Sequence, residues 1–372
     1  MNGNFWNRLK KPILVSAPMV DVTDCVFRYL LTRYSKPNVI FNEFISADGL
    51  TLGNRDRFMK DLRFHYSEDQ HHVAQFFGSK PQNFKVSAQL AKQLQWDGID
   101  INMGCPSRKV ISPKQASGIA LILNPSLAQD IISATMEGAP DLPVSVKTRI
   151  GWDEIEIDHW IPSLLKMKPS ALTVHLRTKK ELSLVPAHWE HSLISKILEM
   201  RDSISPTTKI IGNGDIESLQ DAHIKIQHFQ IDGAMIGRAL YGNPWFFSTR
   251  TFQIDNNNDS LSDYITIGER FRVILEHAIL LEHLIPYKPI VTMSRHYTNY
   301  LSGLSDLGDN AILKKNLIAA ENSIQIHSLL NQYLEQKGKS IYTLDYQLIK
   351  ANIINSLTSN ELSIQQNLLP TS

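Results

Sequence analysis

Short apolar runs rich in β-branched residues recur along the first two thirds of the chain, and this recurrence restricts the possible fold more than any other feature. The runs lie at residues 13–19, 38–44, 72–77, 98–103, 143–149, 171–176, 209–212 and 233–237. Each run is followed by a Gly, Pro, Asn or Asp signal and then by helical periodicity, as at 81–95, 125–136 and 216–229. Alternating strands and helices predict a parallel α/β fold, and eight strands within about 240 residues predict a (β/α)8 TIM barrel.

The pattern changes after residue 247. Residues 253–260 form a polar break, and helical periodicity follows at 264–284, 289–301, 311–336 and, more weakly, 345–357. We therefore expect a barrel domain over residues 1–250, followed by a small C-terminal helical domain over residues 260–360.

Composition narrows the partners and the compartment. The net charge of +1 gives no overall attraction to nucleic acid or to membranes, so an RNA partner would need a local basic patch. The first residues lack the apolar core of a signal peptide, and no run of 18 apolar residues occurs. We expect a cytoplasmic protein without a membrane segment, and a monomer is compatible with the sequence.

The chain has only two cysteines, which are too few for a disulfide framework or a zinc site. Helical periodicity places Cys25 in the core. The histidines at 65, 71 and 72 have no acidic partner at ligand spacing, so we expect no metal. Cys105 follows a strand and precedes Pro106, in a loop of polar and small residues. It is either an inert loop thiol or a group directed at a ligand.

The active site of a TIM barrel is built at the carboxyl ends of its strands. Here those ends supply Asn42 and Glu43, Gln75, Asn102, Lys147 and Arg149, His175 and Arg177, Asn213, Gly214 and Asp215, and Gly237 and Arg238. Taken alone, Lys147 could cap a helix, His175 could be a core histidine and Gln75 could belong to a polar layer of the barrel. Together, the convergent polar ends predict a single site.

Two glycine turns suggest a ligand for that site. Turns after the last two barrel strands commonly bind phosphate through backbone N–H groups, and Asn213-Gly214 and Gly237-Arg238 fit this role. A phosphate site combined with Lys147 suits flavin mononucleotide (FMN), because the ammonium would lie near the edge of the ring that becomes negative on reduction. Without those turns, Lys147 could equally be a Schiff-base lysine.

Six segments together resemble one family in order and spacing. They are Ala17-Pro18-Met19 and the segments 102–110, 145–153, 175–178, 212–215 and 233–238. With these segments the chain resembles the bacterial-type tRNA-dihydrouridine synthases over essentially its whole length. The resemblance implies an FMN-binding barrel followed by a helical tRNA-binding domain, and an oxidoreductase that reduces particular uridines of tRNA with NADPH.

The resemblance also implies residue roles. The positions that correspond to FMN contacts are Pro18, Met19, Val20, Gln75, Lys147, His175, Asn213, Gly214, Asp215, Gly237 and Arg238. Cys105 corresponds to the catalytic acid, and Glu43, Asn102 and Arg149 correspond to positions that face the uracil. The helix around Arg295 resembles the family's RNA-facing helix, and Arg295 with Lys288, Lys314 and Lys315 forms the expected RNA-binding patch.

The chemistry itself sets a requirement on Cys105. The C5=C6 bond of uracil is conjugated to the C4 carbonyl, so hydride adds at C6 and the resulting enolate takes a proton at C5. A proton donor must be a neutral thiol, unlike a nucleophilic cysteine, which must be a thiolate. We expect an unactivated Cys105, with Arg149 or Asn102 holding the charge on O4, and the target nucleotide must leave its stack.

Two segments depart from the family pattern. Residues 114–118 keep one glycine where the family has a pair, and residues 179–188 replace a glycine-rich segment. Lys179 and Lys180 in the second segment fit a solvated surface pair better than a contact to the phosphate backbone of RNA.

Three other functions remain open. They are a flavin oxidoreductase acting on a small enone or dihydropyrimidine, a non-catalytic tRNA-binding or folding protein, and a Schiff-base aldolase using Lys147.

Overall fold

The computed structural model describes residues 3–53, 55–62, 70–252, 264–304 and 310–358. Their contacts divide the chain into two compact units. The first contains residues 3–20 and the described part of 37–238, and the second contains residues 21–36 and the described part of 239–358. The helical unit thus includes the segment that follows the first barrel strand, which the sequence pattern assigned to the barrel.

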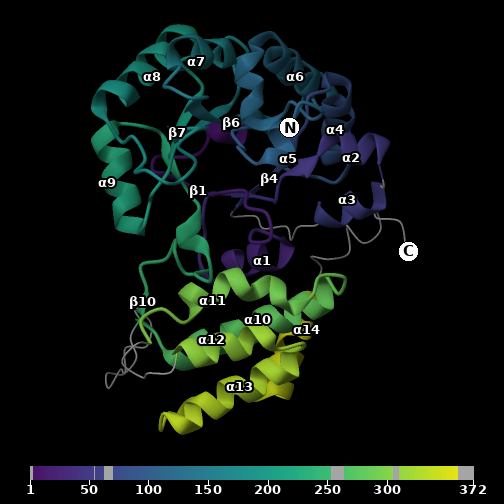
Figure 1. The fold of residues 1–372 in the computed structure, drawn as a ribbon, viewed down its shortest axis with the longest axis vertical. Coiled ribbons are helices and arrows are strands. Elements are labelled where there is room, and N and C mark those ends of the chain that lie inside the picture. The colour runs from purple at the N-terminus through teal and green to yellow at the C-terminus, as the bar shows by residue number, and fades with distance from the viewer. Residues whose placement is uncertain (1–2, 54, 63–69, 253–263, 305–309, 359–372) are drawn as a thin grey trace. The chain divides into compact units, whose positions relative to one another are not determined.

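The first unit is a closed parallel barrel (Figure 1). Its strands pair in the order β2-β1-β9-β8-β7-β6-β5-β4, and pairing of β2 with β4 closes the circle. This confirms the predicted TIM barrel. The strands are β1 (Ile13–Ser16), β2 (Val39–Phe41), β4 (His71–Phe77), β5 (Gly98–Met103), β6 (Val144–Gly151), β7 (Ala171–Thr178), β8 (Lys209–Asn213) and β9 (Gly233–Ile236).

One predicted strand is interrupted. Residues 38–44 were expected to form a single strand, but the structure has β2, a break at 42–44, and then the short strand β3 (Ile45–Ser46), which also pairs with β4. The cause is local: the side-chain Oδ1 of Asn42 accepts the backbone N–H of Gln75 at 2.6 Å, so a side chain replaces the main-chain acceptor. The break leaves Asn42 and Glu43 at the barrel mouth.

Helices lie outside the strands (Figure 1). They are α2 (Ala47–Leu52), α3 (Arg55–Asp61), α4 (Pro81–Gln93), α5 (Arg108–Ile111), α6 (Pro125–Gly138), α7 (Ile157–Leu165), α8 (His191–Ile204) and α9 (Leu219–Phe229). Proline occupies the first turn of α4 and of α6, where a residue needs no N–H partner.

The barrel interior is apolar near the amino ends of the strands and polar near their carboxyl ends. Side chains alternate along each strand, so every second residue points inward. The inward residues nearest the amino ends form one buried cluster with Phe5 and Trp6, which belongs to the segment before β1. Toward the carboxyl ends the inward residues include Gln75 on β4, Asp100 on β5 and Lys147 on β6, which places polar groups at the mouth.

The second unit is helical. It contains α1 (Cys25–Tyr34), α10 (Ile267–Leu284), α11 (Ser294–Tyr300), α12 (Asn310–Ala319), α13 (Ser323–Gln336) and α14 (Tyr346–Thr358), with a small pair of strands, β10 (Thr251–Phe252) and β11 (Tyr264–Ile265). Cys25 is buried at the start of α1, as predicted. The predicted polar break at 253–260 lies outside the described residues.

The prediction of one helix over residues 311–336 is wrong. The structure has two helices, because Asn322 is extended and its side chain accepts the backbone N–H of Gln325 at 2.9 Å, which caps α13. Among the described residues, no helix is long and apolar enough to cross a membrane.

Candidate active site

The polar residues at the barrel mouth come together as predicted, and their spacing follows from the strand register. Asn102 is paired with Lys147 across β5 and β6, and Arg149 is paired with His175 across β6 and β7. His175 is in turn paired with Asn213 on β8. Paired inward residues of neighbouring strands are adjacent, so these side chains line one cavity wall.

Cys105 lies just past β5, partly exposed, in a loop held by its own strand. Asn102 Oδ1 accepts the backbone N–H groups of Cys105 at 2.9 Å and Gly104 at 3.2 Å. Burial raises the pKa of the Cys105 thiol, against opposing effects from a hydrogen bond at Ser107 and the charges of Arg149 and Lys147. The thiol is therefore neutral at neutral pH, which agrees with the expectation of an unactivated acid.

Gly118 is the one glycine retained in the 114–118 segment. Its φ is +61°, and a Cβ there would lie 2.6 Å from the carbonyl oxygen of Cys105. The departure from the family pattern therefore keeps glycine at the position where both conformation and space require it.

Arg149 connects the Cys105 loop to the loop after β7. It is buried, its Nε donates to Gly104 O at 2.9 Å, and its Nη1 donates to Thr178 O at 2.8 Å and to Leu182 O at 2.9 Å. Burial lowers its pKa to about 10, so it stays a cation at neutral pH. Within the described part of the chain Nη2 makes no hydrogen bond, and it is the atom left to face a ligand.

Lys147 and His175 have depressed pKa values for related reasons. Burial lowers the pKa of Lys147 to about 8, and its Nζ donates to Asn213 Oδ1 at 3.1 Å. Burial, followed by the charges of Arg149, Lys147, Arg177 and Arg238, lowers the pKa of His175 well below its usual value. His175 is therefore a neutral imidazole in a strongly positive surrounding.

The tautomer of His175 follows from its neighbour. Arg177 Nη1 lies 3.2 Å from His175 Nε2, and arginine can only donate. Nε2 must accept, so the ring proton is on Nδ1. Neutral His175 thus offers a donor to whatever occupies the site.

Two turns at the ends of β8 and β9 are joined by one carboxylate. Gly214 has φ +126° and Asp215 has φ +47°, so both N–H groups lie in an unusual backbone segment. Asp215 pairs with Arg177 and, at 2.6 Å, with Arg238, and it accepts the N–H of Ala187 at 2.9 Å. This arrangement is suited to an anion, because a turn with left-handed backbone is bordered by two guanidinium groups.

The remaining predicted residues occupy different surroundings. Pro18 and Met19 are half-buried after β1, Val20 is exposed, and Glu43 is buried after β2. Gly237 follows β9, where an added Cβ would meet nothing closer than Met19 Sδ at 3.8 Å. These residues border the mouth of the barrel from the β1, β2 and β9 side.

The predicted RNA-binding patch belongs to the helical unit. Arg295 on α11 is exposed and lies 3.6 Å from Asp21, and Lys314 on α12 donates to Thr298 at 2.8 Å. Lys315 is exposed on α12. Lys288 differs from the expectation, since only 16% of its side chain is exposed and it lies 3.8 Å from Asp24.

One site residue was missing from the predicted set. Asp100 lies two residues before Asn102, on the same face of β5, and it is buried. The signal was present in the sequence, because a charged residue in an apolar strand at period two from a site residue must share its wall.

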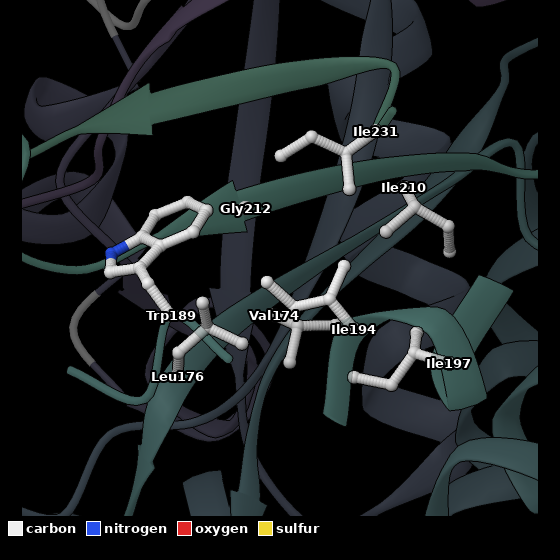
Figure 2. Close-up of a pocket in the computed structure, with 8 residues that line it drawn as sticks. All are labelled: Val174, Leu176, Trp189, Ile194, Ile197, Ile210, Gly212 and Ile231. Carbon is white, nitrogen blue, oxygen red and sulfur yellow. The ribbon is translucent and has the colours of Figure 1, made fainter. Parts of the chain in front are cut away.

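A small apolar pocket lies on the outside of the barrel (Figure 2). Figure 2 shows side chains of β7, β8 and α8 around it, and its lining consists of Val174, Leu176, Trp189, Ile194, Ile197, Ile210, Gly212 and Ile231. No titratable side chain lines this pocket. Val174 and Leu176 alternate along β7 with the inward His175, so they face outward, and the pocket reflects the packing of α8 on the strands. No group of three potential metal-ligating side chains occurs in the part of the chain that the structure describes.

Comparison with known proteins gives a consistent result. Residues 15–337 match the family described as Dihydrouridine synthase (Dus). A probable tRNA-dihydrouridine synthase of Staphylococcus aureus is 35% identical over 92% of this chain and 99% of its own length. Probable tRNA-dihydrouridine synthase 2 of Bacillus subtilis is 34% identical over 85% of this chain and 94% of its own.

Among solved structures, a 2-naphthoyl-CoA reductase superposes with a TM-score of 0.50 at 11% identity. The match covers 66% of this chain and 52% of the reductase, so it supports the barrel fold alone.

Proposed function

Because this chain belongs to the dihydrouridine synthase family, we propose that it reduces specific uridines of tRNA to dihydrouridine, with bound FMN as cofactor and NADPH as reductant. The observation that carries the proposal is the neutral thiol of Cys105, held at a barrel mouth beside a cluster of buried cations. A proton donor next to groups that stabilise negative charge is what reduction of an enone requires.

The residues present fit FMN. The turn at Gly214 and Asp215, with Arg177 and Arg238, is suited to the phosphate, and the amide Nδ2 of Asn42 is buried at the mouth with no hydrogen-bond partner. Lys147 would compensate the charge of the reduced ring, and His175 Nδ1 would donate to it. Pro18, Met19, Val20, Gln75, Asn213 and Gly237 would border the same cofactor.

Reduced FMN, when bound, supplies the hydride that C6 of the uracil receives. Cys105 then gives its proton to C5 and regains one from solvent, since its loop is partly exposed. Arg149 keeps its charge at neutral pH and would hold the negative O4 through Nη2, while the second N–H of Asn102 Nδ2 is also available to the base. Glu43 would face the uracil from the opposite wall. The sum is uridine, NADPH and a proton giving dihydrouridine and NADP⁺.

The helical unit would bind the tRNA, through Arg295, Lys314 and Lys315. In this proposal the barrel is the catalytic domain and the helical domain binds RNA, in a cytoplasmic enzyme that needs no metal. Arg295 and Lys314 lie on neighbouring helices, so one phosphate strand could contact both.

The test is turnover with unmodified tRNA. Purified protein should carry a flavin spectrum and, with NADPH, should add two hydrogens to particular uridines, as detected by mass spectrometry of nucleosides. A yellow protein that reduces small enones but leaves tRNA unchanged would refute the tRNA activity. A colourless protein that takes up no FMN would refute the cofactor as well.

The alternative in which Lys147 forms a Schiff base predicts a covalent adduct between its amine and a carbonyl substrate. Its low pKa would suit an amine nucleophile, but its Nζ is bonded to Asn213 Oδ1. Borohydride treatment with a carbonyl substrate should trap no adduct on Lys147 if the synthase assignment is right.

A further inference from the structure

Three residues on adjacent strands form a buried polar row below the site. Gln75, Asp100 and Ser145 are in register across β4, β5 and β6. Asp100 is completely buried, and its two carboxylate oxygens accept from both neighbours: Oδ2 from Gln75 Nε2 at 2.7 Å and Oδ1 from Ser145 Oγ at 2.6 Å. A carboxylate at this depth needs such partners, because an unpaired buried charge is very costly.

The row continues upward to the loop of the catalytic acid. Gln75 Oε1 accepts from Asn102 Nδ2 at 2.9 Å. Asn102 Oδ1 in turn accepts the backbone N–H groups of Cys105 and Gly104. A continuous chain of hydrogen bonds therefore links Asp100, which touches neither cofactor nor substrate in the proposed function, to the backbone of Cys105.

The direction of the bonds in this chain is fixed at both ends, by Asp100 and by the backbone N–H groups of the Cys105 loop. Each amide can present either its oxygen or its nitrogen to a given neighbour, but a backbone N–H only donates and an ionised carboxylate only accepts. Burial raises the pKa of Asp100 to about 7, so its carboxylate is a pure acceptor above that pH. Gln75 must therefore turn Nε2 toward Asp100 and Oε1 toward Asn102. Asn102 must then turn Nδ2 toward Gln75, which leaves Oδ1 for the Cys105 loop, whose N–H groups need an acceptor.

We propose that Asp100 is a positioning residue, which fixes the amide orientations of Gln75 and Asn102 and thereby holds the Cys105 loop in place for proton transfer. The proposal rests on the proposed function. It couples a cofactor contact, Gln75, to the loop of the acid through one buried carboxylate. Removal of the polarity at Asp100 should disturb protonation of the substrate more than it disturbs the fold.

The first test compares Asp100→Leu with Asp100→Asn. Leucine fills the space but leaves Gln75 Nε2 without an acceptor, so the orientation of the Gln75 amide loses its support from that end. Asparagine can still accept from Gln75, because Ser145 Oγ also lies 3.3 Å from Ile99 O and can turn to donate there. Asp97→Leu is the matched control: its carboxylate accepts the N–H of His72 at 2.8 Å, outside the chain of bonds that begins at Asp100.

Two readouts separate positioning from simple stability. In Asp100→Leu, oxidation of the reduced flavin by tRNA should slow by about tenfold to 100-fold, while reduction of the flavin by NADPH stays within about twofold of wild type. Alkylation of Cys105 should accelerate, with the buried Cys25 as internal reference. Asp100→Asn should restore both quantities toward wild type, and Asp97→Leu should change neither.

The second test exchanges the charge between the two partners. Gln75→Glu alone places two carboxylates in contact, which should impair the tRNA half-reaction severely. Adding Asp100→Asn to Gln75→Glu gives a carboxylate that accepts from both neighbours, so Asn102 keeps its orientation. The double variant should react faster with tRNA than Gln75→Glu does.

Three results would overturn the positioning role: Asp100→Leu behaving like Asp97→Leu, Asp100→Asn being no better than Asp100→Leu, or the double variant being no better than Gln75→Glu. Failure of the proposed function would look different. Wild-type protein would then not be oxidised by tRNA at all, whereas the alkylation rates of the same variants would still decide whether Asp100 holds the Cys105 loop.

Discussion

Burial determines the charge of the reacting groups at the level of single residues. Cys105 keeps its proton because its surroundings disfavour the thiolate, and His175 stays neutral because it is buried among cations. The two effects have the same origin, since desolvation penalises whichever form is charged. The site thus contains a neutral thiol beside Arg149, which stays charged at neutral pH, and Lys147, which loses its proton near pH 8.

The pH dependence of the tRNA half-reaction should report the Cys105 thiol. An acid works only while it is protonated, and burial moves the pKa of Cys105 upward. The rate should therefore stay level past the ordinary cysteine pKa of about 8.5 and fall only at higher pH. Stopped-flow measurement of flavin oxidation from acidic to alkaline pH would show this. A rate that has already declined before the pH reaches 7 would indicate that Cys105 is a thiolate instead.

Lys147 gives a second pH effect, on cofactor affinity. Its pKa is lowered to about 8, so the ammonium is lost as pH rises through that value in the cofactor-free protein. Affinity for anionic FMN should weaken above about pH 8 and remain level below it. Fluorescence titrations should show this decline in wild type, and Lys147→Met should bind more weakly at pH 7 without the decline.

At the level of elements, the loop between β5 and α6 depends on Gly118. Gly118→Ala adds a collision with the Cys105 carbonyl to the cost of a left-handed residue, which is about 1–2 kcal/mol. Gly338→Ala is the matched control, because Gly338 has φ +66° but nothing within 4 Å of an added Cβ. Thermal unfolding should show the larger loss for Gly118→Ala, together with lower tRNA turnover. Equal losses would mean that the loop relaxes freely.

Element boundaries show where sequence reasoning succeeds and where it fails. The periodic runs identified the barrel because apolar alternation and strand-end polarity repeat eight times. The break at 42–44 and the division of 311–336 both depend on one asparagine side chain replacing a main-chain partner, at Asn42 and at Asn322. Such local hydrogen bonds do not alter the hydrophobic period, so periodicity alone passes over them.

The strand-end residues of the candidate site were predictable from the sequence, but their hydrogen-bond partners in the loops were not. Strand ends converge in any barrel, so Asn102, Lys147 and His175 could be grouped from the sequence. The partners of Arg149 could not, because three of its contacts are backbone carbonyls in loops of irregular shape. The inclusion of 21–36 in the helical unit is likewise a tertiary property that no local pattern carries.

At the level of the whole molecule, tRNA affinity should depend on the helical unit. Arg295→Ala should raise the KM for tRNA severalfold without loss of flavin. The slope of log affinity against log salt concentration should fall by about one, the value for one lost phosphate contact. Lys85→Ala provides a charge-matched control, since Lys85 lies on α4 and pairs with Glu137 at 3.2 Å. An unchanged KM in Arg295→Ala would remove α11 from the proposed RNA-binding surface.

The central claim is that Cys105 delivers the proton to C5, and single-turnover oxidation of the reduced enzyme by tRNA tests it most directly. Cys105→Ala should bind FMN and be reduced by NADPH at close to the wild-type rate, but its oxidation by tRNA should slow by about 100-fold or more. In that variant, oxidation by tRNA at the wild-type rate would contradict the account.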